Sequence, residues 1–163
     1  MKKYLNILYT LLFILIQVTI ISKFLIFGYN CNLALVCVII VAALADTNVS
    51  VINAVLAGIL FDVFNCYNVG WHLIMFTIIA LLMVLIVKYM YHGSLISVAL
   101  LTAILTIITE LILFNFGYEV KQNYASYAFL KFILPQTIIN TFSALLLFPI
   151  FKKINRKKNE YKI

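Results

Sequence analysis

The stretch LALVCVIIVAALADTNVSVINAVLAGILFDVF, residues 33–64, decides the fold class. It holds two apolar runs separated by three polar residues, and its only charged residues are Asp46 and Asp62. Neither run alternates polar and apolar residues, as the strands of a transmembrane barrel do. Since only helices and closed barrels satisfy the backbone in lipid, the stretch predicts two apolar helices joined by a tight turn.

The composition of the whole chain has the same character. Of its 163 residues, 66% are hydrophobic and 10% are charged, and the mean hydropathy is +1.13. A soluble domain of this size needs far more polar surface, so the solvent of this chain is the bilayer. The net charge of +7 would suggest nucleic acid in a soluble protein. Here the cations lie mainly at the ends of apolar runs, which indicates topology signals and contact with membrane lipid, and no nucleic-acid partner.

Six apolar segments follow one another, and each is expected to form a helix that spans the membrane. Their expected bounds are residues 5–21, 33–45, 49–64, 71–87, 95–114 and 133–151. The second segment is short, since thirteen residues rise only about 20 Å. The second and third segments therefore form either a spanning hairpin or a partly re-entrant one. We favour two spans, with residues 30–32 extending the second helix. The prediction is an all-α, polytopic membrane helical bundle of six transmembrane helices.

The distribution of Lys and Arg predicts the orientation of this bundle. With six spans, nine cations fall on the side of both termini, and only Lys23, Lys121 and Lys131 fall on the other. The positive-inside rule then places both termini in the cytoplasm. We divide the chain into a six-helix transmembrane domain, residues 1–151, and a basic cytoplasmic tail, residues 152–163. The tail either anchors the topology or docks to anionic lipid or a cytoplasmic partner.

Asp62 is a carboxylate with no Lys or Arg near it in sequence. It is the last of four residues spaced by four, which form one stripe on a helix. Because the other three are small, another helix can approach this stripe closely. Its carboxylate could then accept hydrogen bonds from loop amides, from the start of the next helix at Gly70, or from a polar group such as Glu110 or Gln136. A side chain in this structural role needs hydrogen-bond acceptors. We therefore expect Asp62→Asn to be tolerated and Asp62→Leu to lower the amount of folded protein. The stripe consists of Ser50, Ala54, Gly58 and Asp62.

Polar residues on other spans indicate an interior polar network. Interhelical hydrogen bonds of this kind specify packing more than they add stability. The alternative for the same residues is a substrate or ion pathway. The network candidates are Gln17, Thr106, Glu110 and Gln136, and Asn140 lies on the same face of the last span as Gln136.

The sequence contains no motif for catalysis, a cofactor or a metal. His72 and His92 are isolated, with no acid nearby in sequence, and interfacial hydrogen bonding is their expected role. No HExxH motif, glycine-rich phosphate loop or catalytic triad is present. The three cysteines lack metal-site spacing, and the spacing leaves a disulfide between Cys31 and Cys66 open. We therefore expect no enzyme activity.

Residues 53–76, NAVLAGILFDVFNCYNVGWHLIMF, resemble the central signature of the MreD family of rod shape-determining membrane proteins. That signature is roughly G-F-x-x-G-L-x-x-D, followed after a short gap by L-G. Gly58, Ile59 and Asp62 match its first part, and Gly70 matches its end. Ala54 stands where the family commonly has Gly. The last segment, residues 134–154, is also similar to the last helix of the family, with Pro135, Asn140 and Pro149 in corresponding places.

The resemblance implies a non-catalytic scaffold in the elongation machinery of rod-shaped bacteria, in the cytoplasmic membrane. MreD-like proteins pair with MreC, a single-span protein with an extracellular coiled coil. Together they regulate the RodA glycosyltransferase and its penicillin-binding transpeptidase, in concert with MreB filaments.

The family also resembles, in fold, the six-helix S components of energy-coupling-factor vitamin transporters. This likeness supplies an alternative function, that of a substrate-binding transporter subunit. S components dock through an Ala-x-x-x-Ala stripe on the first helix, whereas residues 1–33 contain no alanine. The sequence therefore favours the scaffold.

Overall fold

The computed structural model describes residues 2–21, 31–65, 70–90, 94–117 and 129–155, and these residues are all helix or short connection. No strand occurs among them, which confirms the all-α prediction, and each expected apolar segment corresponds to one helix. The elements are α1 (Lys2–Ile16) continued by the π-helical η1 (Gln17–Ile21), α2 (Leu33–Leu44), α3 (Thr47–Asn65), α4 (Trp71–Met90), α5 (Leu95–Gly117), and the π-helical η3 (Phe129–Ile133) continued by α7 (Leu134–Asn155).

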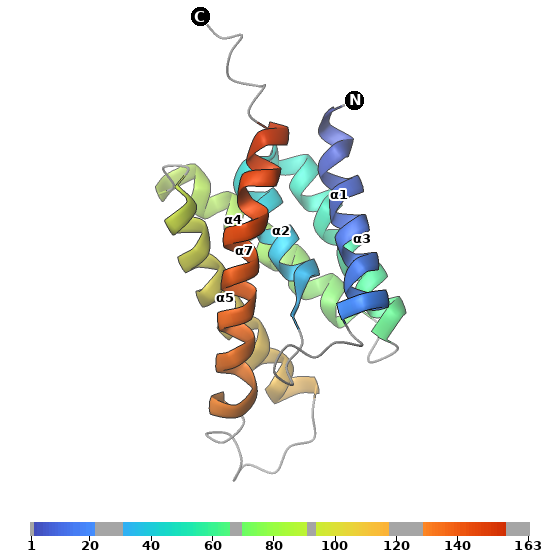
Figure 1. Ribbon diagram of the computed structural model, residues 1–163, viewed down its shortest axis with the longest axis vertical. Helices are drawn as coiled ribbons and strands as arrows, with labels where there is room; N and C mark the ends of the chain where they lie inside the picture. Colours follow the sequence, from blue (N-terminus) through green and yellow to red (C-terminus); the bar gives the residue numbers. More distant parts are fainter. Residues whose placement is uncertain (1, 22–30, 66–69, 91–93, 118–128, 156–163) are drawn as a thin grey trace, which may run out of the picture.

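Successive helices run in alternating directions, so the start of α1 and the end of α7 lie at the same end of the bundle (Figure 1). We call this end the terminal end. Two hydrogen bonds join the helices there: the Asn6 amide donates to Asn155 Oδ1 at 3.1 Å, and the Asn155 amide donates to Asn6 Oδ1 at 3.2 Å. The ring centroid of Phe151 on α7 also lies 6.1 Å from that of Phe13 on α1. These contacts hold the first and last helices together.

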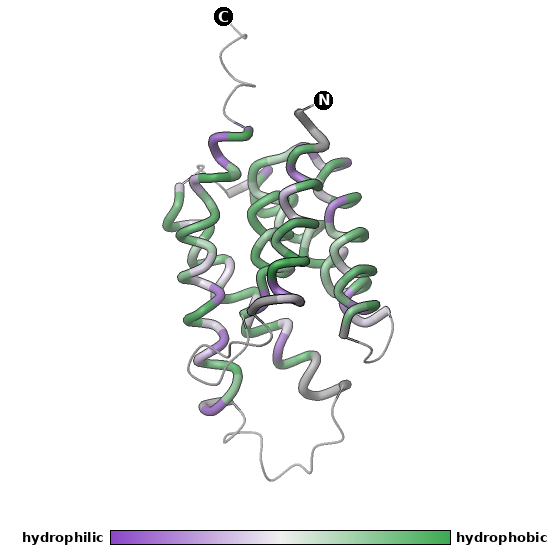
Figure 2. The backbone as a smooth tube through the Cα atoms, turned by 45° about the vertical axis from the view of Figure 1, so that its right-hand side comes forward, coloured by the Kyte–Doolittle hydropathy of each residue, from purple (hydrophilic) through white to green (hydrophobic). Residues whose placement is uncertain are grey.

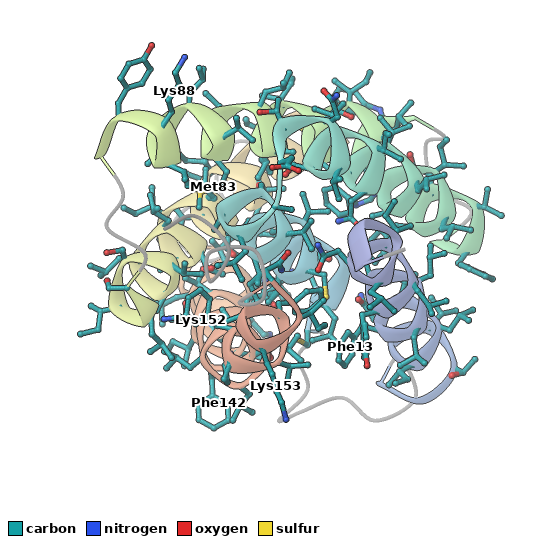
Figure 3. The ribbon with its side chains drawn as sticks, turned by 90° about the horizontal axis from the view of Figure 1, so that it is seen from above. Phe13, Met83, Lys88, Phe142, Lys152 and Lys153 are labelled. Carbon is teal, nitrogen blue, oxygen red and sulfur yellow. The ribbon has the colours of Figure 1, made fainter. Side chains whose placement is uncertain are left out.

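The centre of the bundle is α2, which the other helices surround when the molecule is seen from the terminal end (Figure 3). Every residue from Leu33 to Ala43 is buried. The helix is apolar on all its faces, as expected of a helix enclosed by protein. Its twelve residues rise about 18 Å, well short of the hydrocarbon core.

The start of α2 differs from the sequence-based expectation. Residues 30–32 were expected to extend this helix, but Asn32 is its N-cap, and the Asn32 side chain accepts a hydrogen bond from the backbone N–H of Leu35 at 3.0 Å. A capping residue adopts a non-helical backbone, so the helix begins at Leu33. The expected extension is wrong for this reason, and residue 30 lies outside the described residues.

Within the described ranges, four helical segments have the length and composition to cross a membrane: Thr47–Phe64, Trp71–Tyr89, Leu95–Ile112 and Lys131–Asn155. The apolar parts of α1 and α2, Leu5–Thr19 and Leu33–Leu44, are shorter. Hydrophobic residues dominate the tube along every helix (Figure 2), and large apolar side chains such as Ile96, Ile138 and Phe142 are more than half exposed. Such a surface fits lipid, so the chain is a multi-pass membrane protein.

The last helix continues beyond the expected end of the transmembrane domain at residue 151. It passes Pro149, includes Lys152 and Lys153, and ends at Asn155. Residues 156–163 lie outside the described part of the chain. The division into a transmembrane domain and a basic tail stays a prediction.

Candidate functional site

The carboxylate of Asp62 connects the last turn of α3 to the first turn of α4. Its residue is 1% exposed. Oδ2 accepts hydrogen bonds from the backbone N–H of Gly70 at 2.9 Å and of Leu73 at 3.1 Å, and Oδ1 accepts one from the N–H of His72 at 3.2 Å. The first N–H groups of a helix have no partner within the helix, and the helix dipole favours an anion beside them. Asp62 therefore caps α4 from the preceding helix. We call these four residues the α3–α4 clasp.

The side chain of His72 is a further partner of Asp62. Its Nδ1 lies 2.7 Å from Asp62 Oδ1, within hydrogen-bond distance, and in the tautomer that carries a proton on Nδ1 the ring donates to the carboxylate. The His72 ring packs edge-on against Phe61 and Phe76, with centroids 4.6 and 5.7 Å apart. Sequence analysis missed this contact because it judged the pair by sequence distance. An acid in the last turn of one helix and a histidine in the first turn of the next were the available signal.

At Gly58 the backbone of α4 passes very close to α3. A Cβ atom at this position would lie 2.4 Å from the Cα of Leu73 and 2.8 Å from its backbone nitrogen. Nothing larger than glycine fits without moving the backbone of α4. Gly70, in the turn between the two helices, has a φ of 104°, a left-handed conformation that glycine adopts without strain. The two glycines thus permit the approach and the turn that bring the amides of α4 to Asp62.

The remaining members of the α3 stripe face a different neighbour. The Ser50 hydroxyl lies 3.0 Å from the carbonyl oxygen of Asp46, in its own turn, and 3.4 Å from that of Val41 on α2. Ala54 is fully buried. The stripe therefore packs against α2 at one end and against α4 at the other.

A second polar group holds the start of the central helix. Gln17, in η1, accepts a hydrogen bond from the N–H of Ala34 at 3.0 Å, and Asn140, on α7, accepts one from the N–H of Asn32 at 2.8 Å. The Cys31 thiol also lies 3.5 Å from Asn140 Oδ1 and 3.2 Å from the Ser143 hydroxyl. These bonds tie α2 to the first and last helices. We call Gln17, Asn32 and Asn140 the α2 collar.

A third contact joins α5 to α7. The Gln136 amide donates to Glu110 Oε1 at 2.7 Å. Asp62 is bonded to neither of them. Thr106 is buried and its hydroxyl has no partner among the described residues, and Gln17 serves the α2 collar. The structure thus distributes the expected network over separate places. Pro135, which lacks an N–H, lies at the junction of η3 and α7.

Metal and disulfide chemistry have no support in the described ranges. No group of three His, Cys, Asp or Glu side chains that could hold a metal ion occurs among these residues. Cys31 and Cys37 are buried free thiols. The disulfide that the spacing left open is therefore not formed by Cys31, and Cys66 and His92 lie outside the described residues.

The described polar clusters share one chemical property: their side chains bond backbone or side-chain groups of another helix. Asp62 uses both carboxylate oxygens in this way, and Gln17, Asn140 and Gln136 each contribute at least one hydrogen bond to another element. Bonds of this kind fix the positions of helices.

Comparison with family models places the chain in a known family. The family model described as rod shape-determining protein MreD matches residues 1–158. No curated protein and no solved structure matches significantly.

Proposed function

Because the chain belongs to the family of the rod shape-determining protein MreD, which its match over residues 1–158 shows, we propose that it is a non-catalytic scaffold of the bacterial cell-elongation machinery. It resides in the cytoplasmic membrane with both termini in the cytoplasm. It forms no bond in peptidoglycan itself, and it holds the proteins that do so.

The partners follow from the same proposal. The chain pairs with an MreC-like single-span protein, and through this pairing it regulates the RodA glycosyltransferase and its penicillin-binding transpeptidase. MreB filaments act on it indirectly. Family membership is the observation that carries this proposal, and the buried polar side chains agree with it. Asp62 and Asn140 accept hydrogen bonds from backbone N–H groups of other elements, as suits a framework of fixed shape.

A co-purification experiment tests the proposal. The tagged full-length chain is extracted from its native membrane in a mild detergent, and the proteins that accompany it are identified by mass spectrometry. An unrelated polytopic protein with the same tag is the control. We expect an MreC-like protein and the elongation synthases to be enriched, and depletion of the chain to widen rod-shaped cells.

The same preparation tests the alternative of a transporter S component. That function requires an ATP-binding energising module and a stoichiometric vitamin such as riboflavin, biotin or thiamine. We expect neither to co-purify. Recovery of both, with no MreC-like partner, would replace the scaffold with the transporter subunit.

A further inference from the structure

The lipid-facing side of α7 carries a row of large apolar side chains. Four of them, spaced by four residues, are 42–61% exposed: Ile138, Phe142, Leu146 and Ile150. Residues four apart are neighbours on the surface of a helix. From the first to the last of these residues the helix rises about 18 Å, slightly more than half of a hydrocarbon core of about 30 Å. The row therefore offers the acyl chains of one leaflet a surface of matching length. We call it the α7 row.

Two exposed lysines, Lys152 and Lys153, follow the α7 row at the terminal end. In the view from this end, Lys153 extends away from the bundle on the same side of α7 as Phe142, and Lys152 extends toward the side of α5 (Figure 3). The α7 row thus ends with one ammonium group in line with it and a second beside it.

The ammonium group of Lys152 lies back along the helix. Its Nζ is 5.5 Å from the ring centroid of Phe148, which comes one turn earlier in α7. A cation within about 6 Å of an aromatic centroid is attracted by the ring. This contact keeps the charge near the apolar part of α7, at the level where lipid headgroups meet the hydrocarbon core, and does not let it extend away from the membrane.

Neither lysine is neutralised by the described part of the chain. No carboxylate among these residues forms an ion pair with Lys152 or Lys153. One carbonyl group at the end of α7, that of Phe151, already accepts a hydrogen bond from the Asn155 amide at 2.8 Å. Two uncompensated positive charges beside a membrane attract an anion.

We propose that the terminal end of α7 binds the headgroup of an anionic phospholipid. Lys152 and Lys153 donate hydrogen bonds to its phosphate oxygens, and its acyl chains lie along the α7 row. An acidic protein segment on the membrane surface would neutralise the same two charges but leave the row uncovered. Only an amphiphile with a negative head and apolar chains matches both features. This inference goes beyond the scaffold function and does not depend on its protein partners.

Lipid competition tests the site. The purified full-length chain is given phosphatidylglycerol and phosphatidylcholine in equal amounts, and native mass spectrometry measures the ratio in which the two remain bound. We expect phosphatidylglycerol to be preferred. Lys152→Gln and Lys153→Gln should each lower this preference about fivefold, the contribution of one lysine near an anionic surface. Lys88→Gln is the matched control, because it removes the same charge from the opposite side of the view from the terminal end (Figure 3). It should leave the preference unchanged.

A thermal measurement separates lipid binding from stabilisation of the helix end by the two lysines. Phosphatidylglycerol should raise the Tm of the native chain above its value in phosphatidylcholine. The difference should vanish in the double variant Lys152→Gln/Lys153→Gln, and in the native chain at high salt, which screens exposed charges. An equal loss of Tm in both lipids, or a preference lowered as much by Lys88→Gln, would overturn the site. So would a phosphatidylglycerol effect on the native chain that salt does not weaken, a result that needs no variant to fold.

Discussion

At the scale of single residues, the contacts of Asp62 show how far sequence reasoning reached. The stripe on α3 identified Asp62 and Gly58 as interior positions, because spacing along one helix can be read from the chain. It did not identify His72, because that contact depends on the turn conformation at Gly70, where φ is 104°. The left-handed backbone conformation of Gly70 leads directly into α4, whose first N–H groups lie against Asp62 at the end of α3. The sequence shows a glycine there but not the direction of the returning chain.

The four donors around Asp62 change the expected effect of an Asn substitution. Sequence analysis expected Asp62→Asn to be tolerated, but each carboxylate oxygen faces two donors. The amide nitrogen of Asn would replace one acceptor and leave at least one backbone N–H unpaired, at about 1–3 kcal/mol. We expect Asp62→Asn to lower the folded amount in membranes, and Asp62→Leu to lower it further. Size-exclusion chromatography of a fluorescent fusion measures this amount, with the surface variant Lys88→Gln as control.

A proton relay or transport role for Asp62 would give a different pattern. In that situation Asp62→Asn protein would remain as abundant as the native chain and yet fail to support normal cell width. That combination of abundance and inactivity would contradict the structural role of the α3–α4 clasp.

Gly58 gives a second prediction at this scale. Because an added Cβ would lie 2.4 Å from the backbone of Leu73, even Gly58→Ala should push α4 away from α3. Overpacking of this kind costs about 1–3 kcal/mol. We expect a lower Tm in detergent and wider cells, with larger effects for Gly58→Leu. Ile59→Ala, at a neighbouring side chain that is 45% exposed, is the control. Normal stability of Gly58→Ala would show that the close contact has no structural importance.

At the scale of elements, α2 is the helix that sequence analysis described least well. Its existence and its end were predicted, but it was expected to span the membrane with help from residues 30–32. Hydropathy cannot distinguish a helix surrounded by lipid from one surrounded by protein, since both are apolar on all faces. The buried start of α2 also relies on Gln17 and Asn140, which lie 17 and 108 residues from their bonded partners along the chain. Such distances exceed what periodicity can detect.

The α2 collar leads to a third prediction. Asn140→Leu removes the acceptor for the N–H of Asn32, so the start of α2 should open more often. Hydrogen exchange of a peptide covering residues 31–36 should become faster, because these amides lose their protection. Phe142→Leu changes a side chain on the same helix that is 61% exposed, and it should leave exchange unchanged. Equal exchange in the two variants would mean that Asn140 does not hold α2.

At the scale of the whole molecule, the alternating directions of the helices place several lysines at the terminal end, beside the start of α1 and the end of α7. The ends of α1 and α7 meet through Asn6 and Asn155, and Lys88 on α4 and Lys152 and Lys153 on α7 appear in the view from the terminal end (Figure 3). Lys131 lies in η3, at the opposite end (Figure 1). The sequence predicted this grouping from the number and direction of its apolar segments. An even number of alternating helices returns the chain to its starting side, whether or not the short α2 reaches both surfaces.

This geometry makes the membrane orientation testable with a matched pair of cysteines. Lys153→Cys and Lys131→Cys each replace an exposed lysine, at opposite ends of the bundle, in a Cys66→Ser background whose other two thiols are buried. The excess of Lys and Arg at the terminal end predicts that this end faces the cytoplasm. An impermeant maleimide applied to cells with an intact cytoplasmic membrane should therefore label Lys131→Cys and not Lys153→Cys. Permeabilising the membrane should make both react, which shows that Lys153→Cys is accessible. Labelling of Lys153→Cys in sealed cells would show that the bundle has the opposite orientation, with its cationic end facing away from the cytoplasm.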